Sequence, residues 1–174
     1  MLNPIPSEVD VAVIGAGSAG LPAFRAAREH TDRVILIERG PHGTTCARVG
    51  CMPSKLLIAA AEAAHGMEIA PGFGIHPGSI SIDGEAVMER VRRERDRFVG
   101  FVLDGVDRID PEQKISGQAR FVEDSRLEIG NSQVRAGRVV IASGTSPAIP
   151  DFLEEVRDRV SVNDDVFELS LIHI

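Results

Sequence analysis

The sequence has only two cysteines in 174 residues and no excess of positive charge. Its formal net charge of -7 argues against a nucleic-acid partner, because phosphate backbones attract basic proteins. No uncharged apolar run approaches the roughly 20 residues that a membrane-spanning helix needs, so we expect no membrane partner. The opening MLNPIPSEVD has no basic segment and no apolar core, so we expect no secretion signal and a cytoplasmic protein.

The sequence is apolar enough, at 43% hydrophobic residues, for one well-buried domain. EVDVAVIG (8–15) and RVILIE (33–38) are short β-branched runs, which are typical of buried parallel strands. LPAFRAAREH (21–30) lies between them and predicts a helix. Residues 8–38 therefore predict one β-α-β unit.

The remaining chain predicts helices over 53–65 and 83–109, and loops over 39–50 and 71–79. Residues 115–143 alternate as strands do, with a turn at Gly130-Asn131. RVVIASG (138–144) predicts another buried strand that ends in a glycine. The predicted fold class is α/β, with a parallel sheet and an additional β-meander.

GAGSAG (15–20) fits the dinucleotide fingerprint G-x-G-x-x-G. Gly15 permits the tight turn, Gly17 lets the backbone approach a pyrophosphate, and Gly20 lets helix and strand pack closely. Glu38, at the end of the second predicted strand, is placed to accept hydrogen bonds from a ribose diol. An ordinary glycine-rich turn with a surface acid is the alternative. A flavin or a nicotinamide adenine dinucleotide would each satisfy the pattern.

The segment GTTCARVGCMPSK contains both cysteines, Cys46 and Cys51. A regular helix would separate them by about 7.5 Å of rise alone, too far for a disulfide. Gly50 and Pro53 favour an irregular turn that could bring the thiols together. Cys51 would then lie at the positive end of the next helix, one turn before Lys55, and both influences favour a thiolate. The segment therefore predicts an exchangeable disulfide.

A structural disulfide and a metal site are the other roles open to this pair. A disulfide across so short a loop gains little stability. A metal site would recruit His42 and would still lack one ligand of a closed zinc site, as well as the usual C-x-x-C spacing. We therefore expect no bound metal.

The motifs together resemble a known family. GTTCARVGCMPSK closely resembles the active-disulfide motif of the flavin-dependent, class I pyridine nucleotide–disulfide oxidoreductases. GAGSAG and IASGTSPAIP (141–150) extend the likeness to about residue 168. The PSK ending and the helix LLIAAAEAAH (56–65) are most similar to bacterial dihydrolipoyl dehydrogenases. The resemblance implies a Rossmann-like FAD-binding domain over residues 1–168.

The resemblance also implies roles for single residues, with FAD as the cofactor. The implied cofactor-binding residues are Gly15, Gly17, Gly20, Glu38, Thr45, Lys55, Ala119 and Gly144. Among them, Thr45 would approach the phosphates and Ala119 would contact the adenine through its backbone. The implied catalytic residues are Cys46, Cys51 and Lys55: Cys46 as the interchange thiol, Cys51 as the charge-transfer thiolate facing the flavin, and Lys55 near its ring.

The activity implied is dihydrolipoyl dehydrogenation, in which electrons pass from dihydrolipoamide through the disulfide and FAD to NAD. A free-standing flavin-binding module and a glutathione or mercuric reductase of the same family are the alternatives; the PSK ending disfavours the glutathione enzyme. The sequence departs from the usual pattern at three places: Thr44 replaces a glycine, Ala47-Arg48 replaces the more common apolar-Asn pair, and Ser143 replaces a threonine. Arg48 leaves the substrate, whether lipoyl-bearing or a small disulfide, open.

Enzymes of this family are more than twice as long as this chain. The resemblance implies a nicotinamide-binding domain, and an interface domain that supplies a His-Glu pair to the partner subunit of a homodimer. We therefore expect this chain alone to retain flavin weakly and to show no turnover. The ending LSLIHI (169–174) is a translation of CTGTCTCTTATACACATC, which resembles a transposase-adapter end, so we expect a non-native tail. A genuine hydrophobic C-terminal tail is the alternative.

Overall fold

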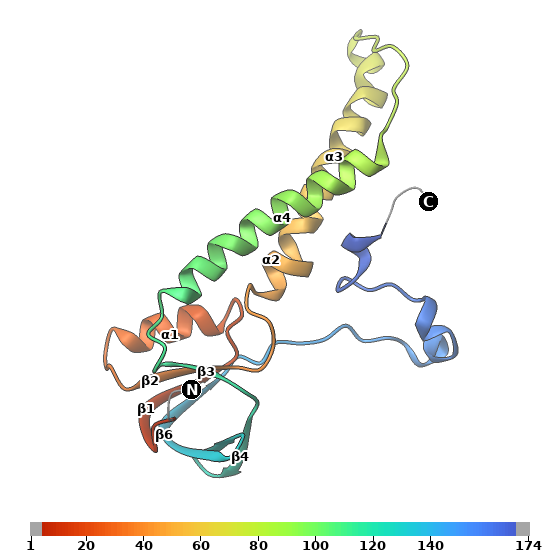
Figure 1. The fold of residues 1–174 in the computed structure, drawn as a ribbon. Helices are drawn as coiled ribbons and strands as arrows, with labels where there is room; N and C mark the ends of the chain where they lie inside the picture. Colours follow the sequence, from red (N-terminus) through yellow and green to blue (C-terminus); the bar gives the residue numbers. More distant parts are fainter. Residues whose placement is uncertain (1–4, 170–174) are drawn as a thin grey trace. The chain divides into compact units, whose positions relative to one another are not determined.

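A computed structural model describes residues 5–169, so the expected non-native tail lies outside the described residues except for Leu169. The chain divides into two compact units (Figure 1). The first, here called the sheet unit, comprises Met1–Thr45 and Phe101–Ser146. The second, here called the helical unit, comprises Cys46–Gly100 and Pro147–Ile174.

The sheet unit contains a six-stranded mixed sheet with the strand order β3-β2-β1-β6-β5-β4. Its strands are β1 Glu8–Ile14, β2 Val34–Glu38, β3 Lys114–Ser116, β4 Ala119–Glu123, β5 Arg126–Ile129 and β6 Ser132–Ile141. The β3-β2-β1-β6 part is parallel, whereas β4, β5 and β6 form an antiparallel meander. The predicted α/β fold with a parallel sheet and a meander is confirmed, as is the turn at Gly130-Asn131.

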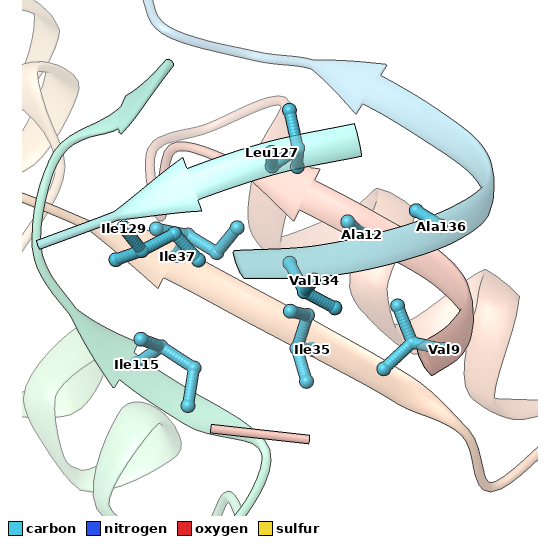
Figure 2. Packing of buried hydrophobic residues seen from close by; sticks show 9 residues of the cluster. All are labelled: Val9, Ala12, Ile35, Ile37, Ile115, Leu127, Ile129, Val134 and Ala136. Carbon is cyan, nitrogen blue, oxygen red and sulfur yellow. The ribbon is translucent and has the colours of Figure 1, made fainter. Parts of the chain in front are cut away.

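The meander and the parallel strands share one hydrophobic core (Figure 2). Leu127 of β5 and Val134 of β6 are fully buried in the same cluster as Ile35 and Ile37 of β2. Because β5 and β2 are not neighbours in the sheet order, this cluster requires the meander to fold back over the parallel strands. Gly137 permits the close crossing, since a Cβ there would lie 3.0 Å from the carbonyl oxygen of Asp10.

Helices cover the opposite face of the parallel strands. Helix α1 (Gly20–Arg28) contributes Leu21 and Phe24 to a second core that includes Leu36 of β2. Each such buried side chain stabilises the fold by about 1.5–3 kcal/mol relative to full exposure. The predicted helix over 21–30 is confirmed. The glycine turn lies directly before this helix, between it and β1.

The helical unit is built from α2 Thr45–Val49 (whose first residue belongs to the sheet unit), α3 Cys51–Ile69, the 84–100 part of α4 Gly84–Asp107, and the 3-10 helices η1 Ala70–Phe73, η2 Asp151–Arg159 and η3 Val166–Glu168. Helices α3 and α4 confirm the two long predicted helices, although α3 is longer at both ends. The loop predictions over 39–50 and 71–79 were wrong where α2 and η1 form. Both elements are too short to show a helical period in the sequence.

Polar contacts connect the later segments of the helical unit to its helices. The Arg90 guanidinium donates to the Leu56 carbonyl at 3.4 Å, which joins α4 to α3. Arg95 of α4 forms ion pairs with Asp96 and with Glu168 of η3. Burial lowers the pKa of Arg95, but the hydrogen bonds to these two carboxylates outweigh burial and raise it above its ordinary value.

One burial prediction was wrong. The run over 138–144 was expected to be a buried strand, but β6 ends at Ile141, which is 68% exposed, after Val140 at 36%. Apolar sequence predicts burial only where another element packs against the strand, and β5 pairs only with residues 132–135 of β6. Among residues 5–169, no helix is long and apolar enough to cross a membrane.

Candidate functional site

The glycine turn between β1 and α1 is shaped by close backbone approaches. Gly15 has φ +103, and a Cβ there would lie 2.2 Å from the Ala142 carbonyl oxygen. A Cβ on Gly20 would lie 1.7 Å from the carbonyl oxygen of Gly15. The chain's own packing therefore requires glycine at both positions. The obstacle to a Cβ is backbone, which cannot move aside as a flexible side chain can.

Gly17 differs from its two neighbours in the fingerprint. A Cβ added there would meet nothing within 4 Å, and its φ is outside the left-handed region. Nothing in the described chain therefore demands glycine at this position. The open space over its backbone fits the approach of a group that the chain does not itself supply, as the fingerprint requires for a pyrophosphate.

Glu38 connects the end of β2 to the glycine turn. One carboxylate oxygen accepts a hydrogen bond from the Ala16 amide at 2.7 Å, and the other accepts from the Gly40 amide at 2.8 Å. The pairing joins residues 22 positions apart and holds the half-buried carboxylate at the mouth of the turn. Each oxygen retains acceptor capacity for a further donor such as a ribose hydroxyl.

A cavity of about 230 Å³ lies at this edge of the sheet unit. It is lined by Ile14, Gly15, Ile37, Glu38, Arg39, Gly117, Gln118, Ala119 and Ser143. Three of the expected cofactor residues, Gly15, Glu38 and Ala119, therefore share one cavity. The cavity lies beyond the carboxyl ends of β1 and β2, where parallel α/β sheets bind their ligands.

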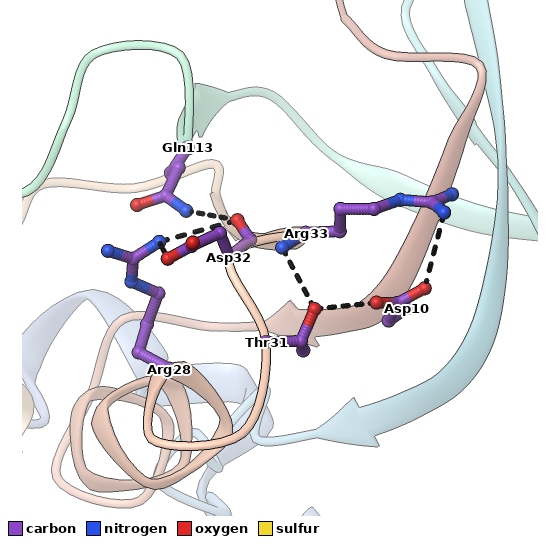
Figure 3. A network of polar contacts seen from close by, with 6 residues as sticks. All are labelled: Asp10, Arg28, Thr31, Asp32, Arg33 and Gln113. Carbon is purple, nitrogen blue, oxygen red and sulfur yellow. Dashed lines mark hydrogen bonds and ion pairs between the residues drawn. The ribbon is translucent and has the colours of Figure 1, made fainter.

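A second cavity, of about 280 Å³, lies at the opposite, amino-terminal edge of the strands. Polar contacts connect residues at and beside this cavity (Figure 3): Gln113, which lines it, donates to the Asp32 carbonyl at 2.7 Å, and the adjacent Thr31 donates through Oγ1 to Asp10 at 2.6 Å. Arg28 pairs with Asp32 at 2.9 Å. This network ties the α1–β2 connection to β1 and to the start of β3, so it serves the fold.

The two cysteines lie at the junction of α2 and α3. Cys46 is the second residue of α2 and Cys51 is the first of α3, separated by the non-helical Gly50 at φ -127 and ψ -114. The two residues are unbridged, yet their side chains are within hydrogen-bonding distance of each other. The expected break at Gly50 is therefore present, and it brings together thiols that a continuous helix would keep apart.

The pair has an asymmetric environment. Cys51 is exposed and Cys46 is half-buried. A hydrogen bond with the Cys51 side chain, then burial and the charge of Cys51, raise the pKa of the Cys46 thiol, while Lys55 acts in the opposite direction. Cys46 therefore holds its proton to higher pH than an isolated thiol, and a neighbouring base would be needed to make it a strong nucleophile at neutral pH.

The remaining predicted residues lie outside the 230 Å³ cavity. Thr45 is exposed at the start of α2, and Gly144 is exposed with φ +70. Thr44, where the resemblance expects glycine, has φ +60, a conformation that costs a residue with a Cβ about 1–2 kcal/mol. Within residues 5–169, no set of three or more His, Cys, Asp or Glu side chains is arranged to hold a metal ion.

The sequence pattern of the pyridine nucleotide-disulphide oxidoreductases matches residues 9–171. The chain belongs to this family. Among its relatives, the mercuric reductase of Streptomyces lividans is 36% identical over 159 residues, covering 84% of this chain and 33% of that protein. The glutathione reductase of Burkholderia cepacia is 32% identical over 162 residues, covering 93% of this chain and 35% of that protein.

A solved structure confirms the fold. The HOCl-induced flavoprotein disulfide reductase RclA from Escherichia coli matches with a TM-score of 0.62 and 21% identity, over 82% of this chain and 29% of that one. At this identity the likeness concerns the fold. The chain spans about a third of the length of the two relatives above, so it contains only part of what a pyridine nucleotide-disulphide oxidoreductase of that length contains.

Several residues of the cavity were not predicted as site residues. Gly117, Gln118 and Arg39 line it alongside the expected positions. The Gly117 amide donates a hydrogen bond to the Glu38 carbonyl at the end of β2, at 2.9 Å. A Cβ on Gly117 would also lie 2.8 Å from the side chain of Ile129. The GQARF run (117–121), which contains Ala119, was the signal available in the sequence for Gly117 and Gln118.

Proposed function

We propose that the chain is the flavin-binding and dithiol-bearing part of an FAD-dependent dithiol/disulfide oxidoreductase that acts on dihydrolipoamide. Family membership gives the oxidoreductase class. The observation that carries the proposal is the pair of thiols, Cys46 and Cys51, held within hydrogen-bonding distance at a helix break. The dihydrolipoamide preference rests on the resemblance of the PSK ending and of the helix LLIAAAEAAH (56–65) to dihydrolipoyl dehydrogenases.

The sheet unit fits FAD. The open space above Gly17 suits a pyrophosphate, and the acceptor oxygens of Glu38 suit a ribose. The 230 Å³ cavity, which includes Ala119, has room for the rest of an adenosine group. When bound, FAD would take up an electron pair from the dithiol and deliver it to a nicotinamide.

The chain's own chemistry is thiol–disulfide exchange. With Cys46 and Cys51 joined as a disulfide, one thiolate of dihydrolipoamide attacks the Cys46 sulfur and releases the Cys51 thiolate. The second thiolate of the substrate then attacks its own sulfur in the mixed disulfide and releases Cys46. The substrate is thereby oxidised to its cyclic disulfide, and the cysteine pair gains two electrons and two protons. Lys55, one turn after Cys51 on α3, places a positive charge near the pair that acts to lower the pKa of Cys46.

The proposed turnover uses parts beyond residues 1–168. The proposal assigns nicotinamide binding to a further domain, and assigns the base that activates Cys46 to the partner subunit of a homodimer. The raised pKa of the Cys46 thiol supports the need for such a base. We therefore expect the chain alone to exchange thiols stoichiometrically, to hold FAD weakly, and to show no NAD-dependent turnover.

A mercuric reductase is the second candidate, because several of the relatives carry that name. Both candidates use the same dithiol and differ in what exchanges electrons with it. The rate at which dihydrolipoamide reduces the oxidised cysteine pair distinguishes the two candidates. Only a dihydrolipoyl dehydrogenase is expected to bind the lipoyl group specifically.

The test is a single-turnover reduction of the oxidised chain by dihydrolipoamide, dithiothreitol and glutathione, with each rate normalised to the same reductant's rate on a small-molecule disulfide. Cys46→Ser and Cys51→Ser are the controls for disulfide formation. We expect a normalised preference for dihydrolipoamide of about tenfold, equivalent to about 1.4 kcal/mol of recognition. Equal normalised rates would contradict the dihydrolipoamide assignment, and failure to form the disulfide would contradict the oxidoreductase role of the pair.

A further inference from the structure

Arg39 lines the 230 Å³ cavity of the sheet unit, directly after Glu38 at the end of β2. The residue is exposed, so its side chain borders the cavity on the solvent side. Among residues 5–169, its guanidinium forms no ion pair or hydrogen bond. Arg33, in the same unit, pairs with Asp10 at 3.6 Å. The Arg39 guanidinium is therefore available to a molecule that enters the cavity.

The walls of this cavity suit a flat apolar group. Ile14, Ile37 and Ala119 contribute apolar surface. Gly117 contributes backbone without a side chain, and a Cβ there would lie 2.8 Å from the Ile129 side chain. Ala119 is paired with Ile129 across the meander, so the sheet holds this wall in place. An aromatic ring fits such a surface better than a hydrated ion does, because apolar walls cannot solvate charge.

The charges around the cavity also favour a neutral group. Glu38 and Arg39 are the two charged residues among those described that line it. Their charges are opposite, and the Glu38 carboxylate would repel a phosphate placed beside it. Gly17, whose open backbone is assigned to the pyrophosphate, is not part of the cavity lining. The part of FAD left for the cavity is therefore its adenosine end, in which the adenine ring is neutral.

We propose that Arg39 binds the adenine of FAD by stacking its guanidinium on the ring. The inference rests on the FAD site of the proposed function, and it adds a residue that sets the affinity of the adenosine end. A guanidinium is planar and cationic, so it is attracted to the face of an aromatic ring. Arginine contacts unstacked bases in the same way in RNA complexes. The acceptor oxygens of Glu38 remain available to the ribose.

The test measures the binding of two small probes to the full chain: AMP, which carries the adenine ring, and ribose 5-phosphate, which has the sugar and phosphate without the ring. Amide NMR titrations to millimolar concentration follow Gly17 and Ala119 in wild type, Arg39→Ala and Arg39→Lys. Arg33→Ala is the charge-matched control, because it removes a cation from the opposite edge of the same unit. FAD is titrated into each protein as well, and the melting temperature of each variant verifies that it is folded.

We expect Arg39→Ala to weaken AMP binding by about threefold to fivefold, which is the size of one cation–π contact at an exposed site. FAD binding should weaken by the same factor, while ribose 5-phosphate should bind as it does to wild type. Arg39→Lys should recover only part of the loss, because an ammonium keeps the charge but has no plane to stack. High salt should leave the effect of Arg39→Ala on AMP in place, since salt screens contacts between exposed charges. Arg33→Ala should change none of these affinities.

An equal loss with AMP and ribose 5-phosphate would overturn the inference, because it would show that Arg39 contacts the phosphate. Full recovery by Arg39→Lys, or an effect that disappears at high salt, would overturn the stacking for the same reason. If the chain binds FAD but AMP does not distinguish wild type from Arg39→Ala, the inference fails and the proposed function stands. If wild type binds neither FAD nor AMP, the flavin site of the proposed function fails first, and the inference falls with it.

Discussion

Replacing Gly20 by alanine would place a Cβ 1.7 Å from the Gly15 carbonyl oxygen and 3.4 Å from the Cβ of Ala142. The first separation is far inside the contact distance of non-bonded atoms, and the obstacle is backbone. The amino end of α1 must therefore move away from β1, which disturbs the packing of Leu21 and Phe24 in the second core. Overpacking of this kind costs about 1–3 kcal/mol, and a backbone obstacle places Gly20→Ala at the upper end.

A loss of about 3 kcal/mol corresponds to a melting temperature lower by about 6–12 °C for a chain of this size. Gly17→Ala is the matched variant, because the same methyl group there meets nothing within 4 Å. Its free energy of unfolding should stay within about 0.5 kcal/mol of wild type. If a pyrophosphate approaches the backbone at Gly17, however, this methyl group should weaken FAD binding by about tenfold or more, because it occupies the space of the ligand.

Thermal unfolding followed by circular dichroism gives the stability of both variants, and equilibrium dialysis against FAD gives their affinity. We expect Gly20→Ala to lose stability and Gly17→Ala to lose only affinity. Equal destabilisation by the two substitutions would refute the assignment of Gly20 to packing and Gly17 to ligand approach. An unchanged FAD affinity in Gly17→Ala would refute the ligand side of the reasoning on its own.

Three further predictions follow from single residues. Glu38→Gln should lower stability by about 1–2 kcal/mol in chemical denaturation, because it weakens charge-assisted hydrogen bonds to two backbone amides, and it should lower FAD affinity; an unchanged midpoint would contradict this. Cys51→Ala should move the pH profile of Cys46 alkylation by iodoacetamide to lower pH, because it removes the hydrogen bond and charge that raise the Cys46 pKa; an unmoved profile would show that burial dominates. Thr44→Gly should raise the free energy of unfolding by up to about 1 kcal/mol, by relieving the positive φ; a lower melting temperature would show that contacts of the threonine side chain outweigh this strain.

Much of the sheet unit could be predicted from local sequence. Buried parallel strands read as continuous β-branched runs, so β1 and β2 were visible in the sequence. The exposed end of β6 was not, because Val140 and Ile141 have the same apolar character as covered residues. Whether a strand is covered depends on the path of the meander, which is set by contacts distant in sequence.

The candidate site could likewise be predicted only in part from local sequence. The break at Gly50 follows from a local rule, since glycine disfavours a helix interior and proline suits its first turn. The hydrogen bond between Glu38 and the Ala16 amide could not be predicted, because its partners lie 22 residues apart and only the sheet brings them together. The five-residue helix that carries Cys46 gave no periodic signal either.

The central claim is that the sheet unit binds a flavin dinucleotide between the glycine turn and the end of β2. An amide NMR titration of the 18.7 kDa chain with FAD, extended to millimolar concentration to capture weak binding, tests it most directly. The account predicts saturable shifts of the amides of Ala16, Gly17, Gly40 and Ala119, with little change at Asp32 and Gln113 on the opposite edge. Shifts confined to that opposite edge, or no saturable shift at millimolar FAD, would contradict it.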